Sequence, residues 1–154
     1  GKQGWMVEEL VDRLRSHPEW RQKLFWLESI NDEYLEQVYA ASSSLIAASY
    51  GEGFGLPLIE AAQHGLPIIA RDLPVFREIA GDHAFYFSAE DAEGLAESIN
   101  AWRTLRQKIQ HPKSGDMPWL TWQESAQRIF EVLVPGVHRG RGSGEANIAV
   151  SSAA

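Results

Sequence analysis

A glycine-rich turn between an apolar run and a helical pattern constrains the fold of this chain more than any other feature. Residues 44–48, Ser-Leu-Ile-Ala-Ala, form a short apolar run typical of a strand that is buried on both faces. Three glycines follow within residues 51–55, where the backbone can adopt a positive φ or approach a ligand closely. Pro57 suits the first helical position, and the helix that it begins is expected to end at Gly65. The stretch predicts a strand, a glycine loop and a helix N-terminus.

This predicted turn has the chemistry of a binding site for a phosphorylated sugar. The first N–H groups of a helix are unpaired and lie at the positive end of its dipole, which favours a phosphate. Glu52 in the loop and Glu60 in the helix flank that position. Since a carboxylate repels phosphate, we expect both to accept hydrogen bonds from sugar hydroxyls. Ordinary turn chemistry and the helix dipole are the alternative explanation for Glu60 taken alone.

The segment from Glu52 to Glu60, E-G-F-G-L-P-L-I-E, resembles the E-x7-E element of retaining glycosyltransferases of family 4, which have the GT-B architecture. The bare spacing has little specificity, but the internal glycines, the proline and the alanines after Glu60 make the whole pattern specific. The resemblance extends over about residues 1–99. It includes F-W-L-E and N-D-E-Y-L within residues 25–35, G-L-P-I-I-A at 65–70 and F-R-E-I-A-G at 76–81.

The resemblance implies roles for individual residues. Glu60 would bind the ribose hydroxyls of a nucleotide-sugar donor, and Glu52, the candidate catalytic residue, would bind the hydroxyls of the donor sugar. Backbone amides would bind sugar and diphosphate oxygens, as preorganised donors do for a developing phosphate leaving group; these are the amides of Gly53, Phe54, Gly55 and Leu56. Ser29 and Ile30 would contact the nucleobase, with an ordinary strand-to-helix turn as the alternative. The resemblance to GT-B enzymes implies no metal ion, and no cofactor is expected because the nucleotide-sugar is itself the donor substrate.

The hydrophobic periodicity predicts an α/β fold. Four strands are expected, at residues 23–27, 44–48, 67–70 and 84–87. Helices are expected between and after them, over residues 6–16, 33–41, 57–64, 75–80 and 92–107, and again after residue 121. This alternation predicts a Rossmann-like parallel sheet flanked by helices, with ligands at the carboxyl ends of the strands. By resemblance, it is the C-terminal half of a GT-B enzyme, incomplete at its N-terminus.

Capping signals predict where several helices begin. Asn31 or Asp32 is expected to cap the second helix, and Asp91 the helix over residues 92–107. Thr121 and Glu124 form a T-x-x-E capping box. His64 precedes Gly65 at a helix C-terminus, where a histidine complements the dipole.

Composition narrows the class of protein. A net charge of −7 and a pI near 5.2 disfavour a nucleic-acid partner. The chain has no cysteine, and no apolar run approaches the roughly 20 residues of a membrane span. We therefore expect a cytoplasmic protein, or one at the cytoplasmic face of a membrane. Residues 1–135 are expected to form one donor-binding domain, and residues 136–154, rich in Gly, Ser and Ala, a disordered tail.

The expected function is retaining, metal-independent transfer of a hexose from a nucleotide-sugar to a glycan or lipid-linked acceptor. Mannose from GDP-mannose, in polysaccharide biosynthesis, is the specific expectation. A GT-B-like nucleotide-sugar epimerase and a non-catalytic nucleotide-sugar-binding module are the alternatives. The resemblance also implies an N-terminal acceptor domain and diphosphate-binding basic residues upstream of Gly1. The chain alone is therefore expected to contain half a site and to be inactive.

Overall fold

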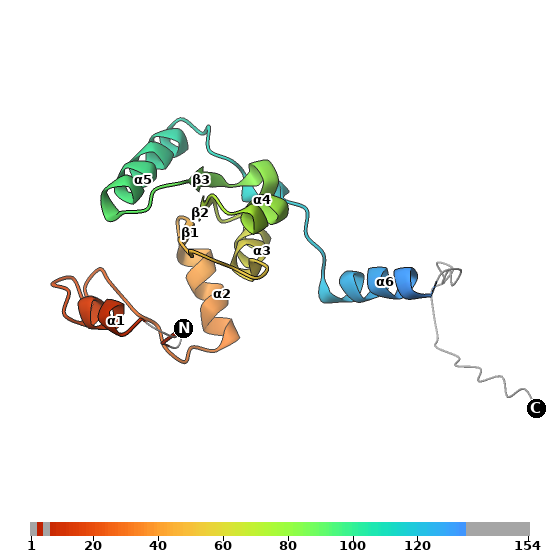
Figure 1. The fold of residues 1–154 in the computed structure, drawn as a ribbon, viewed down its shortest axis with the longest axis horizontal. Coiled ribbons are helices and arrows are strands. Elements are labelled where there is room, and N and C mark those ends of the chain that lie inside the picture. The colour runs from red at the N-terminus through yellow and green to blue at the C-terminus, as the bar shows by residue number, and fades with distance from the viewer. Residues whose placement is uncertain (1–2, 5–6, 135–154) are drawn as a thin grey trace, which may run out of the picture. The chain divides into compact units, whose positions relative to one another are not determined.

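The computed structural model describes residues 3–4 and 7–134. The chain divides into two compact units, Gly1–Pro118 and Trp119–Ala154 (Figure 1). The tail expected over residues 136–154 lies outside the described residues, and the domain limit expected at residue 135 stays a prediction.

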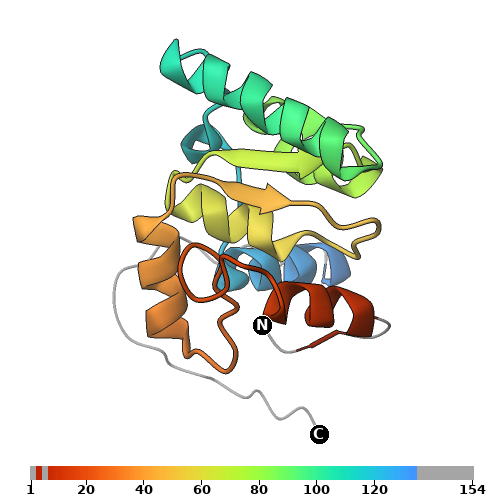
Figure 2. The ribbon, with the colours of Figure 1, turned by 90° about the vertical axis from the view of Figure 1, so that its left-hand side faces the viewer.

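A parallel sheet lies at the centre of the first unit. Within the described residues it has three strands in the order β1 (Leu45–Ala47), β2 (Ile68–Arg71) and β3 (Phe85–Phe87). Leu45 pairs with Ile68, and Ile69 pairs with Phe85, both in parallel register. Figure 2 shows the strands side by side with helices on both faces. The predicted α/β class and three of the four predicted strands are confirmed.

The prediction of a strand at residues 23–27 is wrong. This segment begins in a tight turn, and its Leu24 forms only an isolated parallel bridge with Trp20. The N–H groups of Gln22, Lys23 and Leu24 all donate to the carbonyl of Glu19, at 3.0 Å each. Because these donors are used locally, they cannot enter a ladder with a neighbouring strand. The apolar run in the sequence does not show that these N–H groups bond to the Glu19 carbonyl rather than to a neighbouring strand.

Helices connect and cover the strands. In the first unit they are α1 (Glu8–Arg15), α2 (Asp32–Ala41), α3 (Leu56–Gln63), α4 (Pro74–Ala80) and α5 (Ala92–Gln107), with short 3-10 turns η1 (Gly81–His83) and η2 (Ser114–Asp116). The predicted caps are confirmed: Asn31 accepts the N–H of Tyr34 at 2.9 Å, and Asp91 accepts that of Gly94 at 2.8 Å. Pro57 is the second residue of α3 rather than the first.

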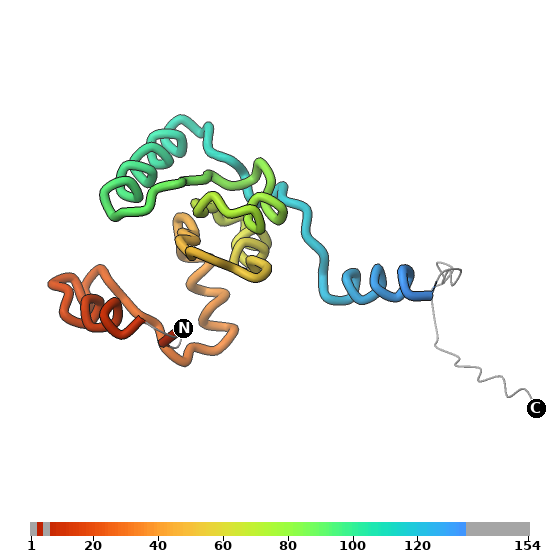
Figure 3. The backbone as a smooth tube through the Cα atoms, in the orientation of Figure 1, coloured from red at the N-terminus to blue at the C-terminus, as the bar shows by residue number. Residues whose placement is uncertain are grey.

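The two faces of the sheet pack against different helices, as the path of the chain in Figure 3 makes visible. On one face, Ile68 and Ala70 pack in a core with residues of α3 and α4, including Leu58 and Phe76. On the other face, Ile69 packs with Phe87 and with Trp102 of α5. Since adjacent strand residues point to opposite faces, the apolar run of β2 is buried on both sides.

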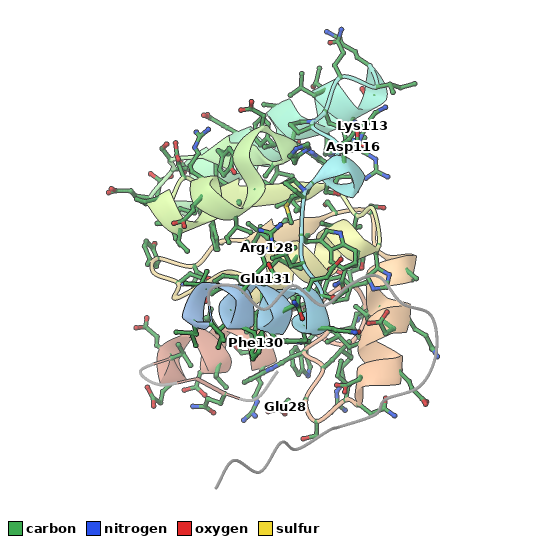
Figure 4. The ribbon with its side chains drawn as sticks, turned by 90° about the vertical axis from the view of Figure 1, so that its right-hand side faces the viewer. Glu28, Lys113, Asp116, Arg128, Phe130 and Glu131 are labelled. Atoms are coloured by element: carbon green, nitrogen blue, oxygen red, sulfur yellow. The ribbon has the colours of Figure 1, made fainter. Side chains whose placement is uncertain are left out.

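The segment after α5 returns to the first core. Ser114, in η2, is almost fully buried, and its hydroxyl donates to the carbonyl of Leu66 at 2.7 Å. Lys113, which precedes η2, and Asp116, which ends it, are labelled in Figure 4. Met117 is also buried in this core. The hydrogen bond therefore joins η2 to the turn that precedes β2.

The described part of the second unit contains helix α6 (Trp122–Leu133). The predicted capping box is confirmed: Glu124 accepts the N–H of Thr121 at 2.8 Å, and the N–H of Glu124 donates to the Thr121 hydroxyl at 3.1 Å. The N–H and the hydroxyl of Thr121 both donate to the Glu124 carboxylate, and these two bonds lower the pKa of that carboxyl. Within the described residues, no helix combines the length and the apolar character that crossing a membrane requires.

Candidate functional site

The candidate site lies where β1 ends. The chain leaves β1 after Ala47, passes through the glycine loop at residues 51–55 and enters α3 at Leu56. Because the strands are parallel, the ends of β2 at Arg71 and of β3 at Phe87 lie at the same edge of the sheet. The strand, glycine loop and helix predicted from the sequence are therefore present in that order.

Gly55 is the glycine that the backbone of this loop requires. It caps α3 with φ = 98° in the left-handed region, and an added Cβ would lie 3.3 Å from the ring of Phe76. Gly51 and Gly53 have open space at the Cβ position and are not among the glycines of positive φ. The loop therefore turns at Gly55 into a helix that has no side-chain cap.

The absence of a cap leaves backbone donors available at this turn. In the described part of the chain, no acceptor pairs with the N–H groups of Phe54, Gly55 and Leu56. The Gly53 N–H differs, because it donates to the Glu52 carboxylate of the preceding residue at 3.0 Å. Three of the four amides assigned to donor binding are thus open, and the fourth would have to exchange its partner.

The two candidate carboxylates have different environments. Glu52 is exposed in the loop, and its Oε1 accepts the Gly53 N–H. Glu60 is half-buried in α3, and its Oε2 accepts the hydroxyl of Tyr39 on α2 at 2.7 Å. Burial, together with the hydrogen bond and charge of Glu60, raises the pKa of the Tyr39 hydroxyl far above its usual value. Tyr39 thus stays protonated and serves Glu60 as a donor.

His64 has a role that the sequence reasoning missed. It caps the C-terminus of α3, as predicted, but its ring also stacks on Tyr39 with centroids 5.3 Å apart and planes 7° apart. Its Nε2 lies 2.8 Å from Oε2 of Glu36 on α2. Helices α2 and α3 are therefore joined by Tyr39–Glu60 and His64–Glu36. A tyrosine two residues before the end of α2 carries no sequence signal for such pairing.

Ser29 and Ile30 lie just before the Asn31 cap of α2. Ser29 is exposed and has φ = 55°, whereas Ile30 is half-buried and lines an apolar groove of about 360 Å³ with Leu35 and Val38. No hydrogen bond among the described residues joins either of them to the glycine loop. Their assignment to a nucleobase stays a prediction.

Arg71 is a second residue that the sequence reasoning left without a role. Its guanidinium donates to the carbonyl of Ala89 at 2.6 Å and to that of Ala48 at 3.4 Å. It also lies over the Tyr50 ring, 4.2 Å from the centroid. Arg71 therefore joins the end of β2 to the segments that follow β1 and β3. A basic residue directly after the apolar strand predicted at 67–70 was the available signal.

The next loop contains a further ion pair. The guanidinium of Arg77 binds both carboxylate oxygens of Asp72, at 2.7 and 2.9 Å, and lies 3.8 Å from the centroid of the Tyr86 ring. Hydrogen bonding to Arg77 lowers the pKa of Asp72. Such a bidentate pair fixes the geometry of the loop between β2 and α4. Among the described residues, no group of three or more acidic, His or Cys side chains could hold a metal ion.

The parallel α/β sheet, with its glycine loop at the carboxyl ends of the strands, is the fold that the resemblance to GT-B glycosyltransferases implies. The family model for group 1 glycosyl transferases matches residues 6–114, and the chain belongs to this family. The fold is also similar to that of sucrose-phosphate synthase from Thermosynechococcus elongatus, with a TM-score of 0.62 and 22% identity over 81% of this chain and 33% of that one.

Curated relatives are similar over part of their length. The serotype-specific mannosyltransferase WbdA of Escherichia coli is 53% identical over 133 residues, which is 86% of this chain and 16% of WbdA. The O-antigen chain mannosyltransferase RfbU of Salmonella typhimurium is 32% identical over 81 residues, or 53% of this chain and 23% of RfbU. The chain thus spans about a sixth of the WbdA length.

Proposed function

We propose that this chain forms the donor-binding part of a retaining, metal-independent hexosyltransferase. The donor is a nucleotide-sugar, with GDP-mannose the specific proposal, and the acceptor is a glycan or a lipid-linked glycan. Membership of the group 1 family supports glycosyl transfer, and the names of the WbdA and RfbU relatives support mannose. Retention and metal independence rest on the resemblance of the E-x7-E segment.

The observation that carries this proposal is the position of Glu60 beside an open helix N-terminus. Glu60 lies on α3, and the N–H groups of Phe54, Gly55 and Leu56, which lead into that helix, have no protein acceptor among the described residues. A nucleotide-sugar has a diphosphate next to a ribose, so it needs N–H donors next to a hydroxyl acceptor. The N-terminus of α3 supplies the N–H donors, and Glu60, one turn into the same helix, supplies the hydroxyl acceptor.

Each candidate residue then has a defined task. The amides of Gly53, Phe54, Gly55 and Leu56 bind sugar and diphosphate oxygens and stabilise the charge that develops on the leaving nucleoside diphosphate. Glu60 accepts hydrogen bonds from the ribose, and Glu52 from the transferred sugar. Ser29 and Ile30 contact the base. The Gly53 N–H leaves the Glu52 carboxylate when the donor binds, which frees both groups for the sugar.

The acceptor is assigned to another part of the protein. The WbdA relatives are about six times longer than the matched region, since it covers 16% of their length. We therefore place the acceptor domain and the basic residues that neutralise the diphosphate outside this chain. A cytoplasmic location, or one at the cytoplasmic face of a membrane, is part of the same proposal.

An acceptor-dependent transfer assay on the complete protein tests this function. GDP-mannose is incubated with lipid-linked glycan acceptors, with and without EDTA, and the new linkage is examined by NMR. The proposal expects an α-linked hexose on the acceptor, formed equally with EDTA. Epimerised sugar nucleotide without acceptor would identify an epimerase. Donor binding without any product would identify a binding module, and either outcome would overturn the proposal.

A further inference from the structure

The Tyr39 hydroxyl and the Glu60 carboxylate lie at the contact between two helices. Tyr39 is in α2 and Glu60 is in α3, and their oxygens are 2.7 Å apart. Both side chains are half-buried. A phenol that donates to a carboxylate makes a short, charge-assisted hydrogen bond, which is stronger than a bond between neutral groups. The orientation of the Glu60 carboxylate therefore depends on where α2 places Tyr39.

This hydrogen bond uses one oxygen of the carboxylate. Tyr39 donates to Oε2, and no protein donor among the described residues binds Oε1. An ionised carboxylate accepts on both oxygens, so Oε1 remains available to a hydroxyl of a ligand. Tyr39 has a single hydroxyl hydrogen and donates it to Glu60, so it has no hydrogen left to donate to a ligand.

The surroundings of Tyr39 restrict its ring on two sides. The ring packs against the core formed by α3, α4 and β2. It also stacks on His64, whose Nε2 lies 2.8 Å from Glu36. Because the Tyr39 ring is already confined by these contacts, it loses little further conformational freedom when its hydroxyl orients Glu60.

We propose that Tyr39 is a positioning residue for ribose recognition. By holding Oε2 of Glu60, it keeps the carboxylate in the orientation in which Oε1 accepts a ribose hydroxyl. This inference rests on the proposed function, because it assumes that Glu60 binds the ribose. A purely structural bond between α2 and α3 is the competing explanation, and it predicts lost stability without a change in ribose recognition.

The test compares GDP with 2′,3′-dideoxy-GDP, which lacks the ribose hydroxyls. Both nucleotides are titrated by calorimetry into the complete protein and into Tyr39→Phe, which removes only the hydroxyl. The wild type is expected to prefer GDP by roughly 10- to 150-fold. Tyr39→Phe is expected to reduce this preference by about 3- to 10-fold, to raise the donor KM and to leave kcat nearly unchanged.

Tyr86→Phe is the matched control. Tyr86 is also half-buried, but its hydroxyl donates to the carbonyls of Phe76 and Gly81 instead of a carboxylate. This variant is expected to lose stability and to keep the full preference for GDP. In a Glu60→Ala background, Tyr39→Phe is expected to change the preference no further, because the two residues act together.

The outcomes separate this inference from the proposed function. A wild type that binds both nucleotides equally, or neither, contradicts ribose recognition by Glu60 and this inference with it. A wild type that prefers GDP, with an unchanged preference in Tyr39→Phe, overturns the role of Tyr39 alone. If Tyr39→Phe does not fold, His64→Ala removes the stacked ring instead. It is expected to narrow the GDP preference, and an unchanged preference would overturn the role of Tyr39.

Discussion

Glu52 and Glu60 are eight positions apart, but their carboxylates have partners of different kinds. Glu52 accepts the N–H of its own neighbour Gly53 at 3.0 Å, and Glu60 accepts the hydroxyl of Tyr39 from another helix at 2.7 Å. The first bond can open when the loop alone moves, whereas the second depends on the packing of α2 against α3. We therefore expect Glu52 to respond to the bound sugar and Glu60 to be placed before the donor arrives.

Glu52→Gln is expected to lower kcat more than it weakens donor binding. The side chain keeps its size, but its charge is lost where, under the proposed function, the transferred sugar develops positive charge. We expect a decrease in kcat of roughly 10- to 100-fold and a change in donor affinity below about 3-fold. Steady-state kinetics and calorimetry on the complete protein measure the two effects. Equal losses in kcat and affinity would make Glu52 an ordinary binding residue.

Gly55→Ala is expected to destabilise the protein. An alanine at φ = 98° is strained, and its Cβ would lie 3.3 Å from the buried Phe76 ring. We expect a loss of about 1–3 kcal/mol in the free energy of unfolding. Gly53→Ala is the control, since its Cβ meets open space and its φ is not in the strained range. Urea unfolding compares the two, and equal stability would contradict the geometry of this turn.

Ser114→Ala tests the buried link between η2 and the turn before β2. The variant leaves the Leu66 carbonyl without its hydroxyl donor in the core, which should cost about 1–3 kcal/mol of unfolding free energy. Ser42→Ala is a matched control, because the Ser42 hydroxyl also donates to a carbonyl, that of Val38, but in an exposed position. Thermal unfolding of both variants is the measurement. A Ser114 effect no larger than that of Ser42 would argue against the buried bond.

The Asp72–Arg77 pair predicts a dependence of stability on pH. Hydrogen bonding to Arg77 lowers the pKa of Asp72 in the folded protein. A lowered carboxyl pKa stabilises the fold above the ordinary value of about 3.9 and loses that effect as pH falls through the lower folded value. The stability difference between wild type and Asp72→Asn should thus be present at neutral pH and vanish in acid. Glu78→Gln on α4 is the control variant. A stability difference between wild type and Asp72→Asn that does not change with pH would contradict a stabilising ion pair between Asp72 and Arg77.

The local features of this fold could be predicted from the sequence. The caps at Asn31, Asp91 and Thr121 follow from side chains that bond to N–H groups three residues away, so they need no knowledge of the tertiary structure. The glycine loop and the helix behind it follow from the same kind of local rule. The residues assigned to the site all came from this loop, its helix and the turn before α2.

The features that sequence reasoning missed depend on contacts between distant segments. Residues 23–27 have the composition of a strand, but the N–H groups of Lys23 and Leu24 donate to the carbonyl of Glu19 in a local turn. Tyr39 and Glu60 are 21 positions apart and meet only because α2 packs on α3. Arg71 similarly bonds to two carbonyls that lie beyond the ends of other strands. Spacing along the chain shows none of these pairs.

Donor binding by Glu60→Ala is the most direct test of the central claim that this carboxylate binds the ribose of a nucleotide-sugar. GDP-mannose is titrated by calorimetry into the complete protein, into Glu60→Ala and into Glu97→Ala, a control at an exposed position on α5. A lost charge-assisted hydrogen bond of about 1.5–3 kcal/mol predicts roughly 10- to 150-fold weaker binding for Glu60→Ala. Glu97→Ala should bind as the wild type does. Unchanged affinity in a folded Glu60→Ala variant would contradict the account and remove Glu60 from the site.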